Sequence, residues 1–411
     1  MMKKKYIFIA IAAICIPMSS GCILRDQPIV RPPVVNKSYY PEEYTIFGTG
    51  TQAEVAAALK RITDEPLPKK ETDQYGITPL MIAASMNCDP AVIDMIGKAG
   101  WKTKEESSWK HTALFYATAY NTEPEITKAL TGYGGLNDKD FIGYTPLYWA
   151  IQCNPNLEIA RMLIRLHADV RVNDFLSIAA SRTEAPWCID VGEFVKLPSC
   201  PYDKTSMDFY QQRAALVREL LAAGAKPNST ILTRVAFRRD DENLEIFKIL
   251  LASGANIGEA LYESGNSLEK TRLLLDAGAK VTASKNRCAP LYIAMQSRSN
   301  PDVGVLLVKA GANVNDECIG GDTPLLALAG EWRKLPDDNQ VLGRGDKTAD
   351  EQAKALLRLT TALIDAGADV NAANDRGETA LDLVQDSKRP ELREFLLKAG
   401  AKAGSGHATK N

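Results

Sequence analysis

The stretch Thr78-Pro79-Leu80-Met81-Ile82-Ala83-Ala84 decides the fold, because the same opening returns along the chain at a fixed spacing. Closely similar stretches occupy residues 112–118 (TALFYAT) and 145–151 (TPLYWAI), so successive threonines are 34 and 33 residues apart. A threonine side chain suits the N-cap of a helix, and proline fits the first helical turn, where no backbone N–H is needed. Each stretch therefore predicts the start of a short helix, and the spacing predicts an array of equivalent units.

A second signature closes each unit. A leucine-rich segment, such as residues 244–251 (LEIFKILL), is followed by a glycine flanked by small residues. Glycine in this place ends a helix in the left-handed conformation. The opening returns at residues 289–291, 323–325 and 379–381. The closing glycines are Gly100, Gly224, Gly254, Gly278, Gly311, Gly367 and Gly400. These openings and closings keep a common register, which predicts pairs of helices along most of the chain.

These residues resemble the ankyrin repeat, which has a period of about 33 residues and the signature T-P-L-H-x-A. The resemblance covers nine units, from about residue 73 to residue 402. The histidine of the signature is replaced by Met81, Phe115, Tyr148, Tyr292, Leu326 and Asp382. The resemblance implies an all-α, ankyrin-type helical-repeat solenoid with short β-hairpin tips over residues 73–404. A helix within residues 51–72 is predicted to cap it. No unit can bury its own apolar face, so neighbouring units must stack.

Three units depart from the regular length. The unit that closes at Gly278 ends only 24 residues after Gly254, so it must lack part of its hairpin or first helix. Two other units are longer than the period by about 23 residues each, and one of them begins after His167, which stands where a closing glycine is expected. The extra residues fall near 182–210 and 332–351. They are expected to be loops, and two interpretations stand: disordered loops without a role, or functional loops.

The N-terminus has the pattern of a secretory signal over residues 1–21. Lys3-Lys4-Lys5 precede an apolar run that is too short to span a bilayer. The run ends in Met18-Ser19-Ser20-Gly21-Cys22, which resembles a bacterial lipobox, although Ser19 replaces the usual leucine. The resemblance implies that the chain is cut before Cys22 and that Cys22 carries lipid. The alternative is an ordinary signal peptide with a chance cysteine at its end.

Residues 22–50 are interrupted by prolines and are expected to form a semi-rigid tether between the lipid and the folded part. Ile23 stands where an aspartate often marks retention in the inner membrane, so the outer membrane, on its periplasmic face, is the expected location. Residues 405–411 are expected to be a disordered tail. Membrane attachment is therefore expected through lipid alone.

No pattern in the chain indicates catalysis. The formal net charge is −2 and no long basic run occurs, which argues against a nucleic-acid partner. The three histidines, His111, His167 and His407, fall in different units, and no pair has metal-ligand spacing. No nucleophile elbow or phosphate-binding loop is present. The sequence therefore predicts no catalytic residues, no metal, no cofactor and no small-molecule substrate.

Six cysteines remain after the signal and Cys22 are set aside. Cys188 and Cys200 lie in one insert, 11 residues separate them, and a disulfide between them is predicted for an oxidising compartment. Cys288 and Cys318 lie near the hairpins of adjacent units and can meet. Cys88 and Cys153 lie two units apart, too far for Cα atoms that must approach within about 7 Å. The alternative for all six is a buried or idle thiol.

Alignment of the units on their threonines places an apolar and aromatic set on the concave side of the array. The hairpin tips carry Tyr75, Ile77, Trp109, His111, Phe141, Ile142 and Tyr144. Met86 and Tyr120 lie at the ends of the first helices. The resemblance implies that such positions meet a protein partner, whereas the alternative is that these side chains pack between neighbouring tips. The expected function is a protein-binding module, and the alternative is a self-associating structural spacer.

Overall fold

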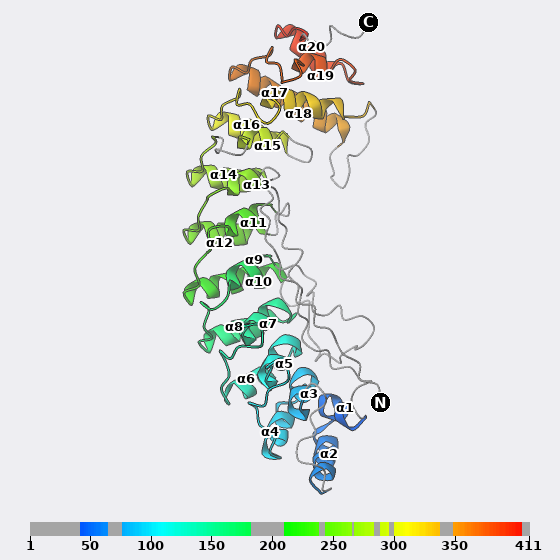
Figure 1. Ribbon diagram of the computed structural model, residues 1–411, viewed down its shortest axis with the longest axis vertical. Helices are drawn as coiled ribbons and strands as arrows, with labels where there is room; N and C mark the ends of the chain where they lie inside the picture. Colours follow the sequence, from blue (N-terminus) through cyan, green and yellow to red (C-terminus); the bar gives the residue numbers. More distant parts are fainter. Residues whose placement is uncertain are drawn as a thin grey trace, which may run out of the picture. The chain divides into compact units, whose positions relative to one another are not determined.

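The computed structural model describes residues 42–64, 76–181, 209–237, 243–264, 267–282, 288–295, 300–337 and 348–404. In these residues it is built from helices arranged in successive pairs (Figure 1). A first pair, α1 (Glu42–Thr49) and α2 (Gln52–Asp64), precedes nine further pairs. We number these pairs as units 1 to 9.

Each unit begins with a short first helix. These helices are α3 (Pro79–Met86), α5 (Ala113–Tyr120), α7 (Pro146–Gln152), α9 (Phe175–Ser181), α11 (Ile231–Phe237), α13 (Ala260–Glu263), α15 (Pro290–Ile293), α17 (Pro324–Arg333) and α19 (Ala380–Leu383). Helix α13, in the unit that closes at Gly278, begins at Ala260, six residues after Gly254, whereas α19 begins at Ala380, thirteen residues after Gly367, so the predicted shortening falls mainly on the hairpin.

The second helices carry the leucine-rich segments. They are α4 (Pro90–Lys98), α6 (Pro124–Thr131), α8 (Leu157–Arg165), α10 (Phe209–Ala222), α12 (Leu244–Ala252), α14 (Leu268–Asp276), α16 (Pro301–Lys309), α18 (Ala349–Asp365) and α20 (Glu391–Lys398). In α8 the buried side chains include Leu157, Ala160 and Leu163, which share one face of the helix. The opposite face carries charge, so each second helix has one apolar side to bury.

Stacking of neighbouring units buries these faces. Each first helix contacts the first helix of the next unit, from α3 through to α19, and the second helices from α4 to α18 form a parallel row of contacts. The buried apolar side chains form one cluster that runs from Leu147 to Ala401 and another that runs from Phe47 to Leu130. The all-α ankyrin solenoid predicted from the sequence is confirmed.

The first helices use the predicted capping threonines, except that Thr112 makes no side-chain hydrogen bond to its helix. The Thr145 and Thr323 side chains each accept a hydrogen bond from the backbone N–H three residues later, and a proline follows each of them. The closing glycines adopt positive φ, for example 93° at Gly224. His167 takes the same role with φ of 68°, as expected from its place in the sequence.

A ladder of asparagines ties the first units together. The Asn121 side-chain amide donates to the carbonyls of Ala84 and Asn87 at 2.9 and 2.8 Å. Asn154 repeats this one unit later, with donations to Thr118 and Asn121 at 3.0 and 2.7 Å. Each asparagine therefore satisfies carbonyls at the end of the preceding first helix, which have no partner within that helix.

Buried cations replace the asparagines further along the array. The Arg213 Nε atom donates to the Ala179 carbonyl at 3.1 Å, and the Lys270 Nζ atom donates to the Val235 carbonyl at 3.2 Å. Both side chains are almost fully buried. The C-terminal ends of the preceding first helices are thus satisfied by a different residue type, which is favoured there by the helix dipole.

Three features differ from the sequence-based expectations. Helix α1 lies within residues 42–49, which were assigned to the tether, and its Phe47 is fully buried. The hairpin tips among the described residues form turns, with an isolated bridge between Ala373 and Thr379 in place of strands. Helix α17 extends to Arg333 and α18 begins at Ala349, so the second insert is shorter than predicted. Among the described residues, no helix is long and apolar enough to cross a bilayer.

Candidate functional site

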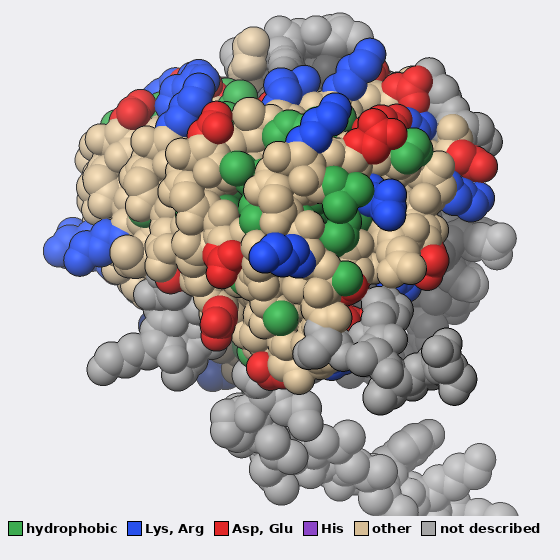
Figure 2. Space-filling view, turned by 90° about the horizontal axis from the view of Figure 1, so that it is seen from above, with side chains coloured by type: hydrophobic (Ala, Val, Ile, Leu, Met, Phe, Trp, Pro, Cys, Tyr) green, Lys and Arg blue, Asp and Glu red, His purple; other side chains and the backbone are tan. Residues whose placement is uncertain are grey.

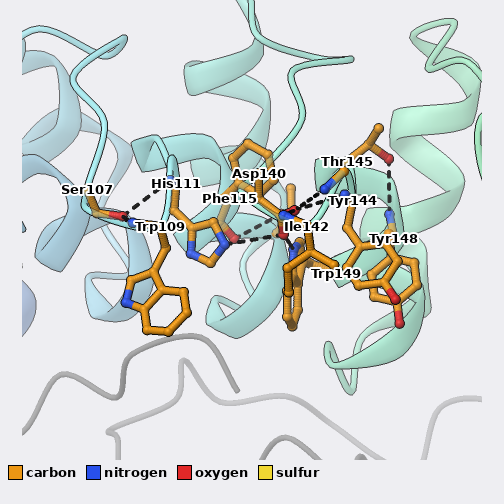
Figure 3. A network of polar contacts seen from close by, with 12 residues as sticks. Ser107, Trp109, His111, Phe115, Asp140, Ile142, Tyr144, Thr145, Tyr148 and Trp149 are labelled. Atoms are coloured by element: carbon orange, nitrogen blue, oxygen red, sulfur yellow. Dashed lines mark hydrogen bonds and ion pairs between the residues drawn. The ribbon is translucent and has the colours of Figure 1, made fainter. Parts of the chain in front are cut away.

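The hairpin turns before α5 and α7 are fixed by one polar side chain each. The Asp140 Oδ1 atom accepts hydrogen bonds from the backbone N–H groups of Ile142, Gly143 and Tyr144, all at 2.9 Å (Figure 3). The Ser107 hydroxyl plays the same part in the preceding unit, where it accepts from the N–H groups two and four residues later. A polar side chain in this position therefore sets the direction in which the following tip residues point.

The second oxygen of Asp140 organises an aromatic layer beneath the turns. Its Oδ2 atom accepts from Trp149 Nε1 at 2.9 Å and lies 3.4 Å from His111 Nε2. The His111 ring stacks on Phe115 with centroids 5.1 Å apart. Burial raises the pKa of Asp140, but hydrogen bonds from His111, Tyr144 and Trp149 outweigh it and hold the pKa below its ordinary value. The carboxylate is therefore a structural anion that links units 2 and 3.

Two tyrosines extend this layer. The rings of Tyr144 and Tyr148 are parallel, with centroids 3.7 Å apart. Burial and the neighbouring Tyr144 raise the pKa of Tyr148, so its hydroxyl stays protonated at physiological pH. The rings of Trp109, Trp149 and Tyr148 extend to the same side of the turns in Figure 3. The layer is stiff because its rings stack on one another and because Asp140 holds Trp149 by a hydrogen bond.

The tips of units 2 and 3 present an apolar surface. Phe141 is 71% exposed and Ile142 is 40% exposed, whereas Trp109 and Tyr144 are half-buried beside them. The Phe141 N–H donates to the Trp109 carbonyl at 3.0 Å, so the two tips are adjacent. We call Trp109, Phe141, Ile142 and Tyr144 the tip surface. Contiguous exposed apolar side chains of this kind are typical of an interface.

The remaining residues of the predicted partner-binding set do not belong to an exposed surface. Ile77 is fully buried, His111 is 4% exposed, and Met86 is 6% exposed because it packs against Gly48 at the end of α1. These three assignments were wrong, since the sequence does not show what covers a tip or the end of a first helix. Tyr120 is half-buried and packs on the core of the N-terminal units. Tyr75 lies outside the described residues.

The sequence analysis also missed residues that shape the surface. Asp140, Ser107 and Trp149 were not singled out, although Asp140-x-x-Gly143-x-Thr145 has a recognisable spacing. In that spacing an acidic or small polar side chain reaches the N–H groups of a tight turn. The same arrangement returns at Asn374, whose Oδ1 atom accepts from the N–H groups of the following turn. The signal was therefore present in the sequence.

The cysteines are only partly within the described residues. Cys288 and Cys318 form a disulfide with Cα atoms 5.0 Å apart, which joins the hairpins of units 7 and 8 as the sequence allowed. Cys88 and Cys153 are disulfide-bonded as well, so none of these four cysteines is an idle thiol. Cys22, Cys188 and Cys200 lie outside the described residues, and so does the predicted bridge between the last two.

No arrangement in the described part of the chain suggests chemistry. No group of three or more His, Cys, Asp or Glu side chains there is placed to hold a metal ion. On the face seen from above, basic and acidic side chains are interspersed with small apolar areas (Figure 2). This face carries no field of a single sign. The tip surface remains the strongest candidate for recognition.

Comparison with known proteins supports the repeat pattern. A family model of ankyrin repeats (3 copies) matches residues 80–174. A nuclear factor NF-kappa-B subunit of Gallus gallus is 29% identical over 136 residues, which are 29% of this chain and 14% of that protein. An ankyrin repeat protein of fowlpox virus is 28% identical over 105 residues, which are 26% of this chain and 31% of that protein. The chain thus spans less than a third of the length of either relative.

Proposed function

We propose that this chain, which carries ankyrin repeats, is a protein-binding module anchored by lipid in a bacterial envelope. Ankyrin repeats generally mediate protein–protein interaction, which is the general part of the proposal. The specific part is that the partner binds the tip surface of units 2 and 3. The observation that carries it is the exposure of Phe141 and Ile142, at 71% and 40%, on turns that Asp140 holds rigid.

The rigidity of the tip surface supports a binding role. Ordering a flexible loop on association costs free energy, whereas a preformed turn has already lost that freedom. Aromatic side chains in such a place are favoured as anchors of an interface. The final unit lacks these features, because Asp375 and Arg376 stand at its tip. The tip of unit 8 also exposes an apolar side chain, Ile319 at 92%, but Gly320 and Asp322 stand there in place of Ile142 and Tyr144. The combination of aromatic and aliphatic side chains is therefore a feature of units 2 and 3 among the described tips.

The anchoring rests on the lipobox-like stretch before Cys22 and is supported by the disulfide. The bond between Cys288 and Cys318 persists in an oxidising compartment and is rare in a reducing cytosol. Export and lipid attachment at Cys22 are consistent with such a compartment. Replacement Cys22→Ala is expected to abolish fatty-acid labelling and to release the protein from membranes. Unchanged membrane fractionation of this variant would contradict the anchor and leave the binding surface untouched.

Partner capture with matched variants tests the binding role. The full chain is solubilised from the envelope in detergent, and co-purifying protein is quantified for the native chain, a Phe141→Ser/Ile142→Ser variant and a Tyr133→Ser control. Tyr133 is 48% exposed but lies after α6, away from the tip surface. We expect a stoichiometric foreign partner that is lost at least tenfold in the tip variant and retained in the control. Equal capture by both variants would contradict the proposal, and capture of only this chain would favour the structural spacer.

A further inference from the structure

Neighbouring hairpins are linked at a common position along the array. The residue directly before the N-cap of one first helix meets the residue five places before the N-cap of the next first helix. Between units 2 and 3, His111 Nε2 lies 3.4 Å from Asp140 Oδ2 (Figure 3). Between units 8 and 9, the Asn374 side-chain amide donates to Asp322 Oδ1 at 3.2 Å. The two contacts share one register, so this position joins one unit to the next.

A disulfide takes the same position between units 7 and 8. Cys288 stands directly before Ala289, which is the N-cap of α15. Cys318 stands five residues before Thr323, which is the N-cap of α17. The two cysteines are bonded, with Cα atoms 5.0 Å apart. Of these three links, this one is covalent and can be opened and closed by thiol chemistry.

Helix α15 has little of its own to keep it folded. It has four residues, and its N-cap Ala289 makes no side-chain hydrogen bond to it. A helix of this length is not stable by itself in water, and alanine is a poor N-cap. Helix α19 has the same length, but the side chains of Thr379 and Asp382 each accept a hydrogen bond from the other's backbone N–H. The start of α15 is therefore held mainly by the disulfide that precedes it.

The elements around α15 are held without the disulfide. On the unit 8 side, the Gly320 carbonyl accepts from the Asp375 N–H at 2.9 Å, so the turn of unit 8 is also attached to unit 9. In the layer of second helices, α16 and α18 pack so closely that a Cβ added at Gly304 would lie 2.8 Å from Leu359 Cδ2. Loss of the disulfide should therefore act on α15 and leave its neighbours in place.

We propose that the Cys288–Cys318 disulfide is a redox latch on α15. While the bond is intact, it holds α15 against unit 8, and its reduction lets α15 unfold locally. Leu291 of α15 and Met295 just after it are at most 3% exposed, so this opening uncovers apolar side chains on unit 7. The latch goes beyond the proposed binding function, and it depends neither on the tip surface nor on the lipid anchor.

The chemical step is a thiol–disulfide exchange with an external dithiol. Cys288 and Cys318 are half-buried, so a dithiol can approach their sulfurs. One thiolate of the dithiol attacks a sulfur of the pair, which breaks the S–S bond, forms a mixed disulfide and releases the other cysteine to take up a proton. The second thiol of the dithiol then displaces the remaining cysteine. The pair gains two electrons and two protons, and the dithiol leaves as a disulfide.

Amide hydrogen exchange of the full chain, with and without dithiothreitol and in the absence of denaturant, tests the latch. We expect the pair to be reduced under these native conditions. The Ile293 and Ala294 amides, which are hydrogen-bonded within α15, should then exchange about tenfold faster or more. Helix α19 is the internal control, because it has the same length and is capped by side chains, and its exchange should not change. Removal of the reductant and reoxidation should restore slow exchange in α15.

Two variants separate this bond from the other disulfides, since Cys88 and Cys153 are also disulfide-bonded and meet the same reductant. The Cys288→Ser/Cys318→Ser variant should show fast exchange in α15 with and without dithiothreitol. The Cys288→His/Cys318→Asp variant copies the link between units 2 and 3. It should keep exchange in α15 slow under both conditions.

Several results would overturn the latch. A pair that is reduced only in denaturant would be an enclosed staple. Unchanged exchange of α15 in the reduced chain would show that the helix does not depend on the bond, and equal acceleration in α15 and α19 would show a general loss of stability. A response of the Cys288→His/Cys318→Asp variant to dithiothreitol would assign the effect to the other disulfides. Each of these results leaves the proposed binding at the tip surface unaffected.

Discussion

Asp140 is the residue on which the tip surface depends. Its side chain is 1% exposed and accepts three backbone hydrogen bonds and one from Trp149. Hydrogen bonds to a charged group contribute more than neutral ones, and removal of the acceptor leaves buried donors unsatisfied. The position combines two roles, since it fixes the turn of unit 3 and joins it to His111 of unit 2.

Replacement Asp140→Ala is expected to destabilise the array by about 3 kcal/mol in urea unfolding, because several donors lose their acceptor together. Asp138→Ala is the matched control, since Asp138 is exposed, and a change under about 0.5 kcal/mol is expected there. Equal midpoints for the two variants would show that Asp140 does not hold the turn.

The pH dependence of stability follows from the same carboxylate. The pKa of Asp140 is lowered in the folded protein, so its contribution is complete above the unfolded value of about 3.9 and is lost as pH falls through the folded pKa. The native chain should therefore lose stability below about pH 4 more steeply than Asp140→Ala. Parallel curves for the two proteins in acid would contradict the assignment.

At the scale of the elements, the asparagine ladder holds the first helices together. Asn121 is 2% exposed and bridges units 1 and 2 through two carbonyls. Replacement Asn121→Ala leaves these carbonyls buried without a donor, and a loss of about 2–3 kcal/mol is expected in chemical unfolding. Asn371→Ala is the control, because the hydrogen bonds of Asn371 are exposed and water can replace them. Similar losses in both variants would argue against a role for burial.

The disulfide joins two units whose first helices, α15 and α17, make few contacts with each other. Helix α15 has four residues, so unit 7 offers little first-helix surface to α17, and Cys288–Cys318 ties the two hairpins across this place. The bond closes a loop of 30 residues. The chain-entropy relation gives about 3–4 kcal/mol for such a loop. The Cys288→Ser/Cys318→Ser variant should lose this amount in unfolding experiments, and native stability of the variant would refute it.

The sequence predicted the elements that local signals specify. Threonine caps, prolines in the first turn and closing glycines determine where a helix starts or ends from residues close to that point. The helix pairs could therefore be located from the spacing of these residues along the sequence. Helix α1 was missed because its sequence has weak helical patterning and the helix is stabilised by burial of Phe47 against α3, which is a tertiary effect. Ile77, Met86 and His111 were misassigned for the same reason, since burial at a tip or at the end of a first helix depends on neighbouring elements.

At the scale of the whole molecule, the stacked units form an array for which we propose binding through the tips of units 2 and 3. The mixed charge of the surface and the compact turns fit a specific protein partner better than a charged polymer. Lipid at Cys22 would hold the array at a membrane, while Phe141 and Ile142 face away from the core. In unit 9, buried Arg389 donates to the Pro336 carbonyl at 2.6 Å and to Asp350 at 2.7 Å, and thereby holds both ends of the second insert.

Photo-crosslinking in living cells tests the central claim most directly. A benzophenone amino acid replaces Phe141 in one strain and Tyr133 in another, and both side chains are exposed in the native chain. After irradiation, we expect a covalent adduct between the chain and one foreign envelope protein from the Phe141 position, with none from Tyr133. Adducts of equal yield from both positions, or no adduct from Phe141, would contradict a partner at the tips of units 2 and 3.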